Sequence, residues 1–202
     1  GRHRRPVSTT NRPPTPIDEL LDRAIAAINR GDRTTASALA EQVLSVESGN
    51  RDAEDLLVAP TAGSGELRRL TILFADIVDS TALSTRIYYT VIGRYRQQVN
   101  EIIERYEGHV FSTKGDGLLA VFGHPKAHEN DVRRAVQAGL DITRDVARLS
   151  EQVRSRFGFD IAVRVGVHRG LVYLDLAQDD VYGLGANLAS RVCGLAPPDC
   201  VV

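Results

Sequence analysis

An acidic residue stands where a strand-like segment gives way to a turn. The segment 70–75 is apolar and β-branched, and Asp76 follows it directly. Such a run predicts a strand. Ser80 and Thr81 come next and can cap a helix, whose exposed N–H groups attract phosphate. Taken alone, Asp76 is more typical of an Asx turn before a helix cap, but its partners further along favour a metal ion bound to a polyphosphate.

A second carboxylate lies in a turn between two apolar segments. Asp116 stands in Lys114-Gly-Asp-Gly117, and an Asp-Gly turn between apolar runs predicts a β-hairpin. We expect this hairpin to lie next to the first strand, so that Asp76 and Asp116 converge. Hard oxygen ligands with open positions are what Mg²⁺ prefers, and a metal is therefore predicted between the two carboxylates.

An amide and a guanidinium are predicted to share one face of a helix. Asn187 and Arg191 are four residues apart in a segment with helical spacing. The pair suits a site where negative charge develops on a phosphoryl group, although a solvated helix face is the simpler interpretation of the pair alone. Arg164 lies in a predicted strand, where a phosphate contact and a salt bridge at the strand edge are equally compatible with its position.

Composition limits the classes of function. Lys and Arg number 25 against 26 Asp and Glu, so neither nucleic acid nor an anionic membrane is indicated as a partner. No apolar run approaches the roughly 20 residues of a membrane span and no leader pattern is present, so we expect a cytoplasmic protein without membrane insertion. Cys193 and Cys200 have no further cysteine pair near them that would complete a metal site. Free thiols are favoured, with a disulfide between them as the alternative.

The chain is predicted to contain a small helical segment before its main domain. Residues 1–16 are interpreted as disordered or linker, 17–58 as a helical hairpin, 59–67 as a linker, and 68–202 as the main domain. Small residues at Ala24, Ala36 and Ala40 would let two helices approach closely. The spacing from Gly31 through Ala36 and Ala40 to Gly49 resembles one tetratricopeptide repeat, with a plain helical hairpin as the alternative. One such repeat is expected to pack on a partner or a further domain.

The main domain has the pattern of an α+β fold. After the first strand, helices are predicted at about 80–106, 131–157 and 184–195, and strands at 109–113, 118–122, 161–167 and 171–174, the last two separated by a tight turn. We expect a ferredoxin-like βαββαβ sheet with helices on one face. Val201 and Val202 read as the start of another strand, so a fragment of a longer protein is expected. The residues predicted to point inward from the second helix are Val132, Ala135, Val136, Leu140, Ile142 and Val146.

Four strings in this domain resemble the class III nucleotidyl cyclase catalytic domain. They are Phe74-Ala-Asp-Ile-Val-Asp-Ser-Thr81, Thr113-Lys-Gly-Asp-Gly117, Arg164-Val-Gly-Val-His168 and Asp180-Val-Tyr-Gly-Leu-Gly-Ala-Asn-Leu-Ala-Ser-Arg191. They occur in the family's order, and the resemblance spans residues 68–202. It implies that ATP is converted to 3′,5′-cyclic AMP and pyrophosphate, with Mg²⁺ or Mn²⁺, at sites shared between the two chains of a homodimer.

The resemblance also assigns roles to individual residues. One protomer would bind metal through Asp76, Asp116 and the carbonyl of Ile77. Its partner would orient the ribose with Asn187, stabilise the transition state with Arg191, and accept a proton from the adenine amino group with Asp180. Phosphates would be bound by Arg164 and by the turn from Phe74, which includes Val78, Asp79, Ser80 and Thr81.

One position departs from the family's pattern. A base-reading lysine is usual where this chain has Ser112, and Lys114 lies two residues later, about 7 Å along a strand. ATP is favoured over GTP because a carboxylate at Asp180 would repel the guanine carbonyl, so guanylate cyclase is the weaker alternative. A cyclase fold without turnover, acting as a nucleotide-responsive regulatory module, is the alternative from another class.

Overall fold

The computed structural model describes residues 13–61, 65–78, 85–111 and 117–202. The chain divides into two compact units, Gly1–Thr61 and Ala62–Val202. Within the described ranges, no helix has both the length and the apolar character needed to cross a membrane.

The first unit contains three helices that pack through small residues. They are α1 (Pro16–Asn29), α2 (Arg33–Val46) and α3 (Arg51–Val58). Helix α1 begins one residue before the predicted hairpin because Thr15 and Asp18 form a capping box around a proline in the first turn. Ala24, Ala36 and Ala40 are fully buried, which lets the backbones of α1 and α2 approach closely.

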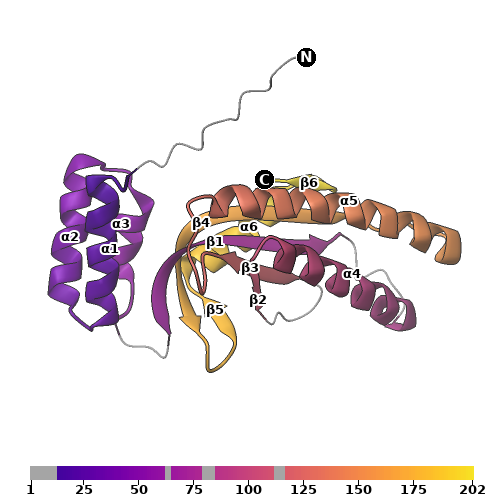
Figure 1. Cartoon of the computed structure of the whole chain (residues 1–202), viewed down its shortest axis with the longest axis horizontal. Helices are drawn as coiled ribbons and strands as arrows, with labels where there is room; N and C mark the ends of the chain where they lie inside the picture. The colour runs from indigo at the N-terminus through magenta and orange to yellow at the C-terminus, as the bar shows by residue number, and fades with distance from the viewer. Residues whose placement is uncertain (1–12, 62–64, 79–84, 112–116) are drawn as a thin grey trace, which may run out of the picture. The chain divides into compact units, whose positions relative to one another are not determined.

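The described residues of the second unit form a mixed sheet with three helices. Its elements are β1 (Glu66–Ile77), α4 (Thr85–Arg105), β2 (His109–Phe111), β3 (Leu118–Phe122), α5 (Asp131–Phe157), β4 (Val163–Asp175), β5 (Asp180–Tyr182), α6 (Leu184–Leu195) and β6 (Cys200–Val201). The strand order is β2-β3-β1-β4-β5, and β6 pairs with β4 in parallel (Figure 1). The predicted α+β fold with a ferredoxin-like βαββαβ core is confirmed.

Strands β1 and β4 form one long antiparallel ladder. They pair continuously from Glu66 opposite Leu174 to Ile77 opposite Val163. The predicted tight turn between 167 and 171 is therefore wrong: Gly170 lies in mid-strand opposite Leu70, where twelve consecutive partners on β1 keep β4 extended. Strand β1 also begins at Glu66, inside the predicted linker, because its first residues pair with the distal part of β4.

Apolar side chains cover both faces of this sheet. Odd-numbered residues of β1 such as Leu73 and Ala75 pack beneath α4 and α5, whereas Leu70 and Ile72 pack with α6 on the other face (Figure 1). The prediction that the helices lie on one face is right for α4 and α5 and wrong for α6. Because both alternating sets of the strand are apolar, the sheet needs cover on each side.

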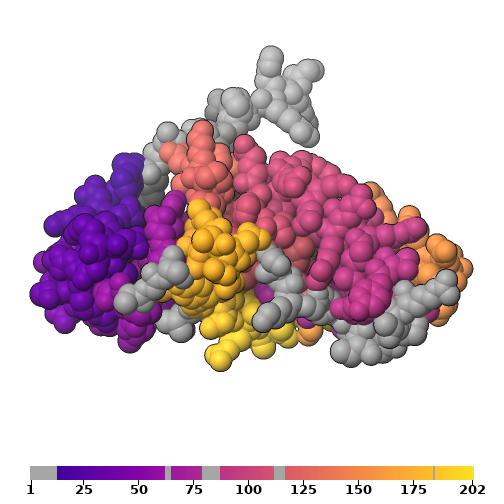
Figure 2. All heavy atoms as spheres, turned by 90° about the horizontal axis from the view of Figure 1, so that it is seen from below, coloured from indigo at the N-terminus to yellow at the C-terminus, as the bar shows by residue number. Residues whose placement is uncertain are grey.

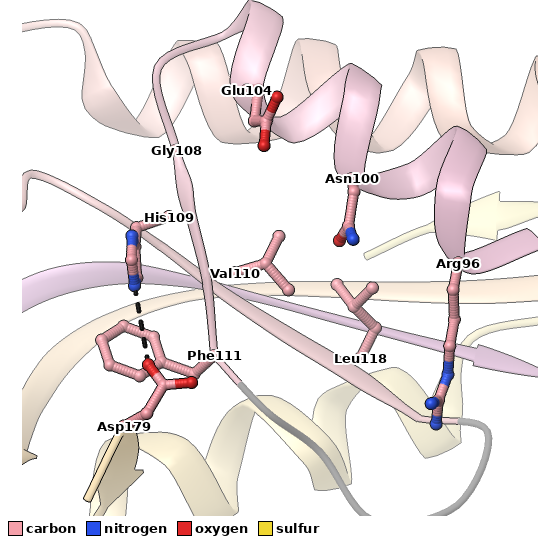
Figure 3. A pocket seen from close by; sticks show the side chains of 9 residues that line it. All are labelled: Arg96, Asn100, Glu104, Gly108, His109, Val110, Phe111, Leu118 and Asp179. Carbon is pink, nitrogen blue, oxygen red and sulfur yellow. Dashed lines mark ion pairs between the residues drawn. The ribbon is translucent and has the colours of Figure 1, made fainter.

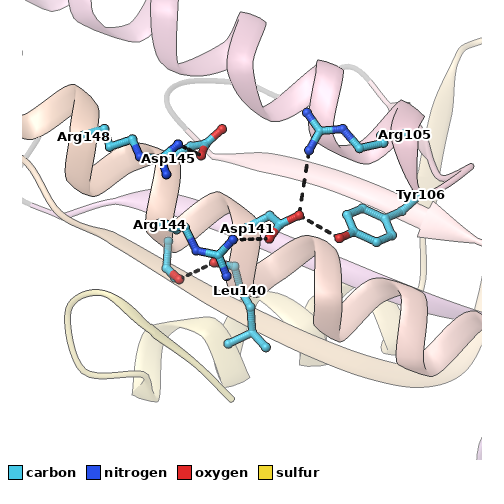
Figure 4. A network of polar contacts seen from close by, with 8 residues as sticks. Arg105, Tyr106, Leu140, Asp141, Arg144, Asp145 and Arg148 are labelled. Atoms are coloured by element: carbon cyan, nitrogen blue, oxygen red, sulfur yellow. Dashed lines mark hydrogen bonds and ion pairs between the residues drawn. The ribbon is translucent and has the colours of Figure 1, made fainter. Parts of the chain in front are cut away.

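Helix α4 buries Val91, Tyr95, Val99, Ile102 and Ile103. Of the six residues predicted to point inward from α5, Ala135, Ile142 and Val146 are buried and the other three are not. Val132, Val136 and Leu140 are 44%, 37% and 50% exposed. The buried side of α5 also contains Ala138 and Gly139, and Gly139 lies against Val165 and Val201, so that the helix approaches the strands closely. Next to Leu140, Asp141 accepts a 2.7 Å hydrogen bond from Tyr106, which ties the end of α4 to α5 (Figure 4).

Helix α6 lies directly on β4 because two glycines leave room for its backbone. A Cβ atom added at Gly166 would be 2.5 Å from the backbone nitrogen of Cys193, and one added at Gly185 would be 2.5 Å from the carbonyl oxygen of Leu171. A side chain at either position would clash with backbone atoms, and the clash could be relieved only by moving α6 away from β4. These two contacts fix the distance between α6 and the sheet.

We predict that Gly166→Val destabilises the second unit by at least about 2 kcal/mol, since the added side chain overlaps helix backbone. All six tyrosines lie in this unit and the chain has no tryptophan, so tyrosine fluorescence during urea unfolding reports on it alone. Gly194→Ala is the matched control on α6, because nothing lies within 4 Å of its added Cβ. Equal stability of Gly166→Val and the unsubstituted chain would contradict the close approach.

Candidate active site

Two opposite charges face each other near the end of the long ladder. Asp76 on β1 lies opposite Arg164 on β4, and both project from the face covered by α6. The Arg164 Nη2 atom is 3.6 Å from Asp76 Oδ2, with side chains 29% and 28% exposed. Of the two interpretations left open for Arg164, the salt bridge at the strand edge is therefore present. A carboxylate at a sheet end next to a cation is suited to charged ligands.

The last turns of α6 lie beside this ion pair. Arg164 Nη1 donates a 3.5 Å hydrogen bond to the carbonyl of Gly194, and the thiol of Cys193 donates to the carbonyl of Arg164 at 3.2 Å. Burial raises the pKa of the Cys193 thiol to about 11, and the negative charge of Asp76 contributes to this rise. Both cysteines are free thiols, so the disulfide left open by the sequence is absent.

The residues around Asp76 bring β3 to the same edge. Phe74, half-buried, lies against Gly117, where an added Cβ would be 2.8 Å from its ring. Leu118, the first residue of β3, lies opposite Ala75. Ile77 is buried and ends β1, and the Val78 N–H donates to the carbonyl of Ala162 at 2.9 Å. Six predicted site residues lie outside the described part of the chain: Asp79, Ser80, Thr81, Ser112, Lys114 and Asp116.

Asn187 and Arg191 share the solvent-facing side of α6. Both are exposed, whereas Ala186, Ala189 and Cys193 form the side of the helix buried on the sheet. The helix begins after Gly183, which has a φ of 110°, and the Asn187 N–H donates to the Gly183 carbonyl at 3.2 Å. The predicted amide and guanidinium are thus presented to solvent, away from the core of their own chain.

Asp180 is the first residue of β5. This strand lies at one end of the strand order and β2 lies at the other, but the two come close together in space. The sheet curls, so that Asp179, which precedes Asp180, lies 3.8 Å from His109 on β2. Figure 2 shows the β4–β5 hairpin beside α4 and β2. Asp180 itself is exposed. The curl thus places the start of β5 next to the strand that precedes Ser112 in the sequence.

A pocket of about 390 Å³ is lined in part by His109 and Asp179. Its polar lining comes from α4 and from the two edge segments, and Figure 3 shows the side chains of Arg96, Asn100, Glu104, His109 and Asp179 around it. None of these residues was predicted to belong to a site. Because their proximity depends on how the sheet curls, their spacing in the sequence contains no signal of it.

Comparisons with known proteins identify the family of this domain. The model of the family described as the adenylate and guanylate cyclase catalytic domain matches residues 64–201. The receptor-type adenylate cyclase ESAG 4 of Trypanosoma brucei brucei is 24% identical over 163 residues, which cover 64% of this chain and 13% of that protein. The chain spans between 13% and 21% of the length of the first curated relatives.

Two solved structures share the fold. The adenylyl cyclase CyaB from P. aeruginosa aligns with a TM-score of 0.61 and 22% identity, covering 67% of this chain and 77% of that one. The monomeric guanylyl cyclase domain of the RhoGC fusion protein from the aquatic fungus Blastocladiella emersonii aligns with a TM-score of 0.58 and 23% identity, covering 68% and 81%. Since the family match covers more than half of the chain, the chain belongs to the adenylate and guanylate cyclase catalytic domain family.

Proposed function

We propose that this domain converts ATP to 3′,5′-cyclic AMP and pyrophosphate at two sites shared between the chains of a homodimer. The observation that supports this proposal is that the two sets of candidate site residues lie on different surfaces of one chain. Asp76 lies at the end of the central strand, whereas Asn187 and Arg191 face solvent on α6. A second copy can therefore supply the amide and guanidinium that complete a site around Asp76, as the family resemblance implies.

The residues at the end of β1 suit a divalent cation. The carboxylate of Asp76 is a hard oxygen ligand, the kind that Mg²⁺ prefers, and it lies at a strand end where it is only partly buried. The carbonyl of Ile77 and the carboxylate of Asp116 would complete the set, and the pairing of Leu118 with Ala75 brings the strand after Asp116 to this edge. Mg²⁺ or Mn²⁺, when bound, would neutralise the triphosphate and lower the pKa of the ribose 3′-hydroxyl.

The remaining residues would orient the nucleotide for in-line attack of the 3′-oxygen on the α-phosphorus. Arg164 and the turn from Phe74 through Val78 to Thr81 would bind the phosphates of the leaving pyrophosphate. Asn187 of the second copy would fix the ribose, and its Arg191 would donate hydrogen bonds to the charge that develops at the α-phosphoryl oxygens. These donors act on the transition state, so their loss is expected to lower the rate of the chemical step.

We further propose that Asp180 selects adenine. Its carboxylate can accept a hydrogen bond from the adenine amino group, and its exposure at the start of β5 leaves it accessible to a base. Asp179 lies 3.8 Å from His109, so this segment is next to the strand that precedes Ser112 and Lys114, the other candidate base readers. This proximity supports a base site formed by both edge segments.

For the N-terminal unit we propose a tetratricopeptide-like helical module within residues 17–58, joined to the cyclase domain of 68–202 by a linker. The support is its fully buried alanines and the way Arg33 donates to the carbonyls of Leu57 and Ala59, which links the start of α2 to the end of α3. A further domain or partner protein is the expected contact of this module.

The shared site predicts complementation between two inactive variants. Asp76→Asn and Arg191→Ala should each lose at least about 100-fold in cyclic AMP formation with ATP and Mn²⁺. An equimolar mixture allowed to re-equilibrate should recover about one quarter of the unsubstituted activity, because half the dimers are mixed and each mixed dimer retains one complete site.

The control is a mixture of the Asp76→Asn chain with a chain that has both substitutions, Asp76→Asn and Arg191→Ala. No dimer in this mixture has a complete site, so it should stay inactive. Failure of the equimolar mixture to gain activity, although size-exclusion chromatography shows mixed dimers, would contradict the shared site. A full chain that binds ATP without turning it over would favour the regulatory-module alternative.

Base selection predicts a difference between two adjacent carboxylates. Asp180→Asn should lower the ratio of kcat/KM for ATP to that for GTP by about 10-fold or more, since the acceptor for the adenine amino group is weakened. Asp179→Asn removes the same charge one residue away and should change the ratio by less than about threefold. Steady-state kinetics with both nucleotides measure the ratios, and equal shifts in the two variants would rule out a specific role for Asp180.

A further inference from the structure

Arg164 is fixed at its backbone and loosely bound at its guanidinium. Its main chain pairs with β1 on one side and with β6 on the other, and its carbonyl accepts a hydrogen bond from the Cys193 thiol at 3.2 Å. The guanidinium makes long contacts instead, 3.6 Å to Asp76 and 3.5 Å to the Gly194 carbonyl. Its Nε atom is buried with no hydrogen-bond partner among the described residues.

The position of this guanidinium conflicts with a metal on the same carboxylate. A divalent cation bound to Asp76 would bring like charges together at a distance where their repulsion is strong in a partly buried site. The pair is only about 30% exposed, so solvent screens it incompletely. Metal entry therefore requires the guanidinium to move, and its long contacts make such a movement inexpensive.

We infer that Arg164 is a placeholder for the metal: it neutralises Asp76 while the nucleotide is absent and moves onto the phosphates when metal and nucleotide enter together. The inference rests on the proposed function. The triphosphate offers the guanidinium shorter, bidentate hydrogen bonds than Asp76 and Gly194 do, and the unpartnered Nε becomes available for them. Arg164 would thus bind Asp76 in the empty site and the phosphates in the loaded site.

The exchange makes metal binding depend on nucleotide. Without nucleotide, the cation must displace Arg164 and leave its charge unpaired, so metal alone binds weakly. With nucleotide, the phosphates receive the displaced guanidinium, and each ligand strengthens binding of the other. Asp76 is thereby kept from holding a stray cation in a site without substrate.

The test is Mn²⁺ binding to the nucleotide-free full chain, measured by electron paramagnetic resonance of the free ion. Arg164→Gln should bind Mn²⁺ about 10-fold more tightly than the unsubstituted chain, the effect expected from removing one neighbouring charge. Arg164→Met, which keeps the aliphatic stem, should show the same gain. Arg169→Gln is the matched control: it removes the same charge from the same strand at an exposed position and should change the affinity by less than twofold.

Asp76→Asn separates this inference from the proposed function. If Asp76→Asn abolishes Mn²⁺ binding while both neutral Arg164 variants bind it no more tightly than the unsubstituted chain, the placeholder role is wrong and the metal site stands. If Mn²⁺ binds equally well to Asp76→Asn, the metal assignment fails and the inference with it. Tyrosine fluorescence during urea unfolding verifies that each variant is folded. A non-hydrolysable ATP analogue should raise Mn²⁺ affinity by a larger factor in the unsubstituted chain than in Arg164→Gln.

Discussion

The antiparallel pairing of β1 with β4 is the constraint on which the rest of the second unit depends. Because the ladder runs without interruption from Glu66 to Ile77, alternation assigns every side chain on β1 to one face or the other. Leu73, Ala75 and Ile77 pack beneath α4 and α5, and Asp76 is left on the opposite face, facing Arg164. A slip of one residue would bury the carboxylate beneath α4 and α5 and move Leu73, Ala75 and Ile77 to the face of α6.

The second constraint is the close contact of α6 with the sheet. Gly166 and Gly185 allow helix backbone to touch strand backbone, and the alanines of α6 fill the remaining space. A helix pressed this closely against a sheet can use only one side for packing. Asn187 and Arg191 must therefore face outward, and a site that needs both an acidic strand end and this polar helix face is more easily completed by two chains than by one.

The sequence predicted where the helices begin and end better than which of their faces is buried. The bounds of α5 and α6 matched because apolar periodicity marks both helices, and Gly158, in the left-handed conformation, ends α5. The inward face predicted for α5 was right for half of its residues and wrong for Val132, Val136 and Leu140. These three make an apolar stripe of their own, and only packing against the strands distinguishes it from the buried side. The turn predicted at Gly170 failed for a similar reason: glycine is typical of turns, but twelve paired residues outweigh one local preference.

In the site, too, the sequence indicates which residues carry charge but not which of them come into contact. The charges at Asp76 and Arg164 are evident in the sequence, but their contact follows only from register. The approach of Asp179 to His109 follows from curvature of the whole sheet, and with side chains 59% and 46% exposed this pair is too weakly coupled to impose that curvature. The apolar cluster that includes Phe111, Val121 and Val181 joins the two edges instead. Burial of those side chains is therefore the physical reason that a base reader on β5 can lie beside one that follows β2.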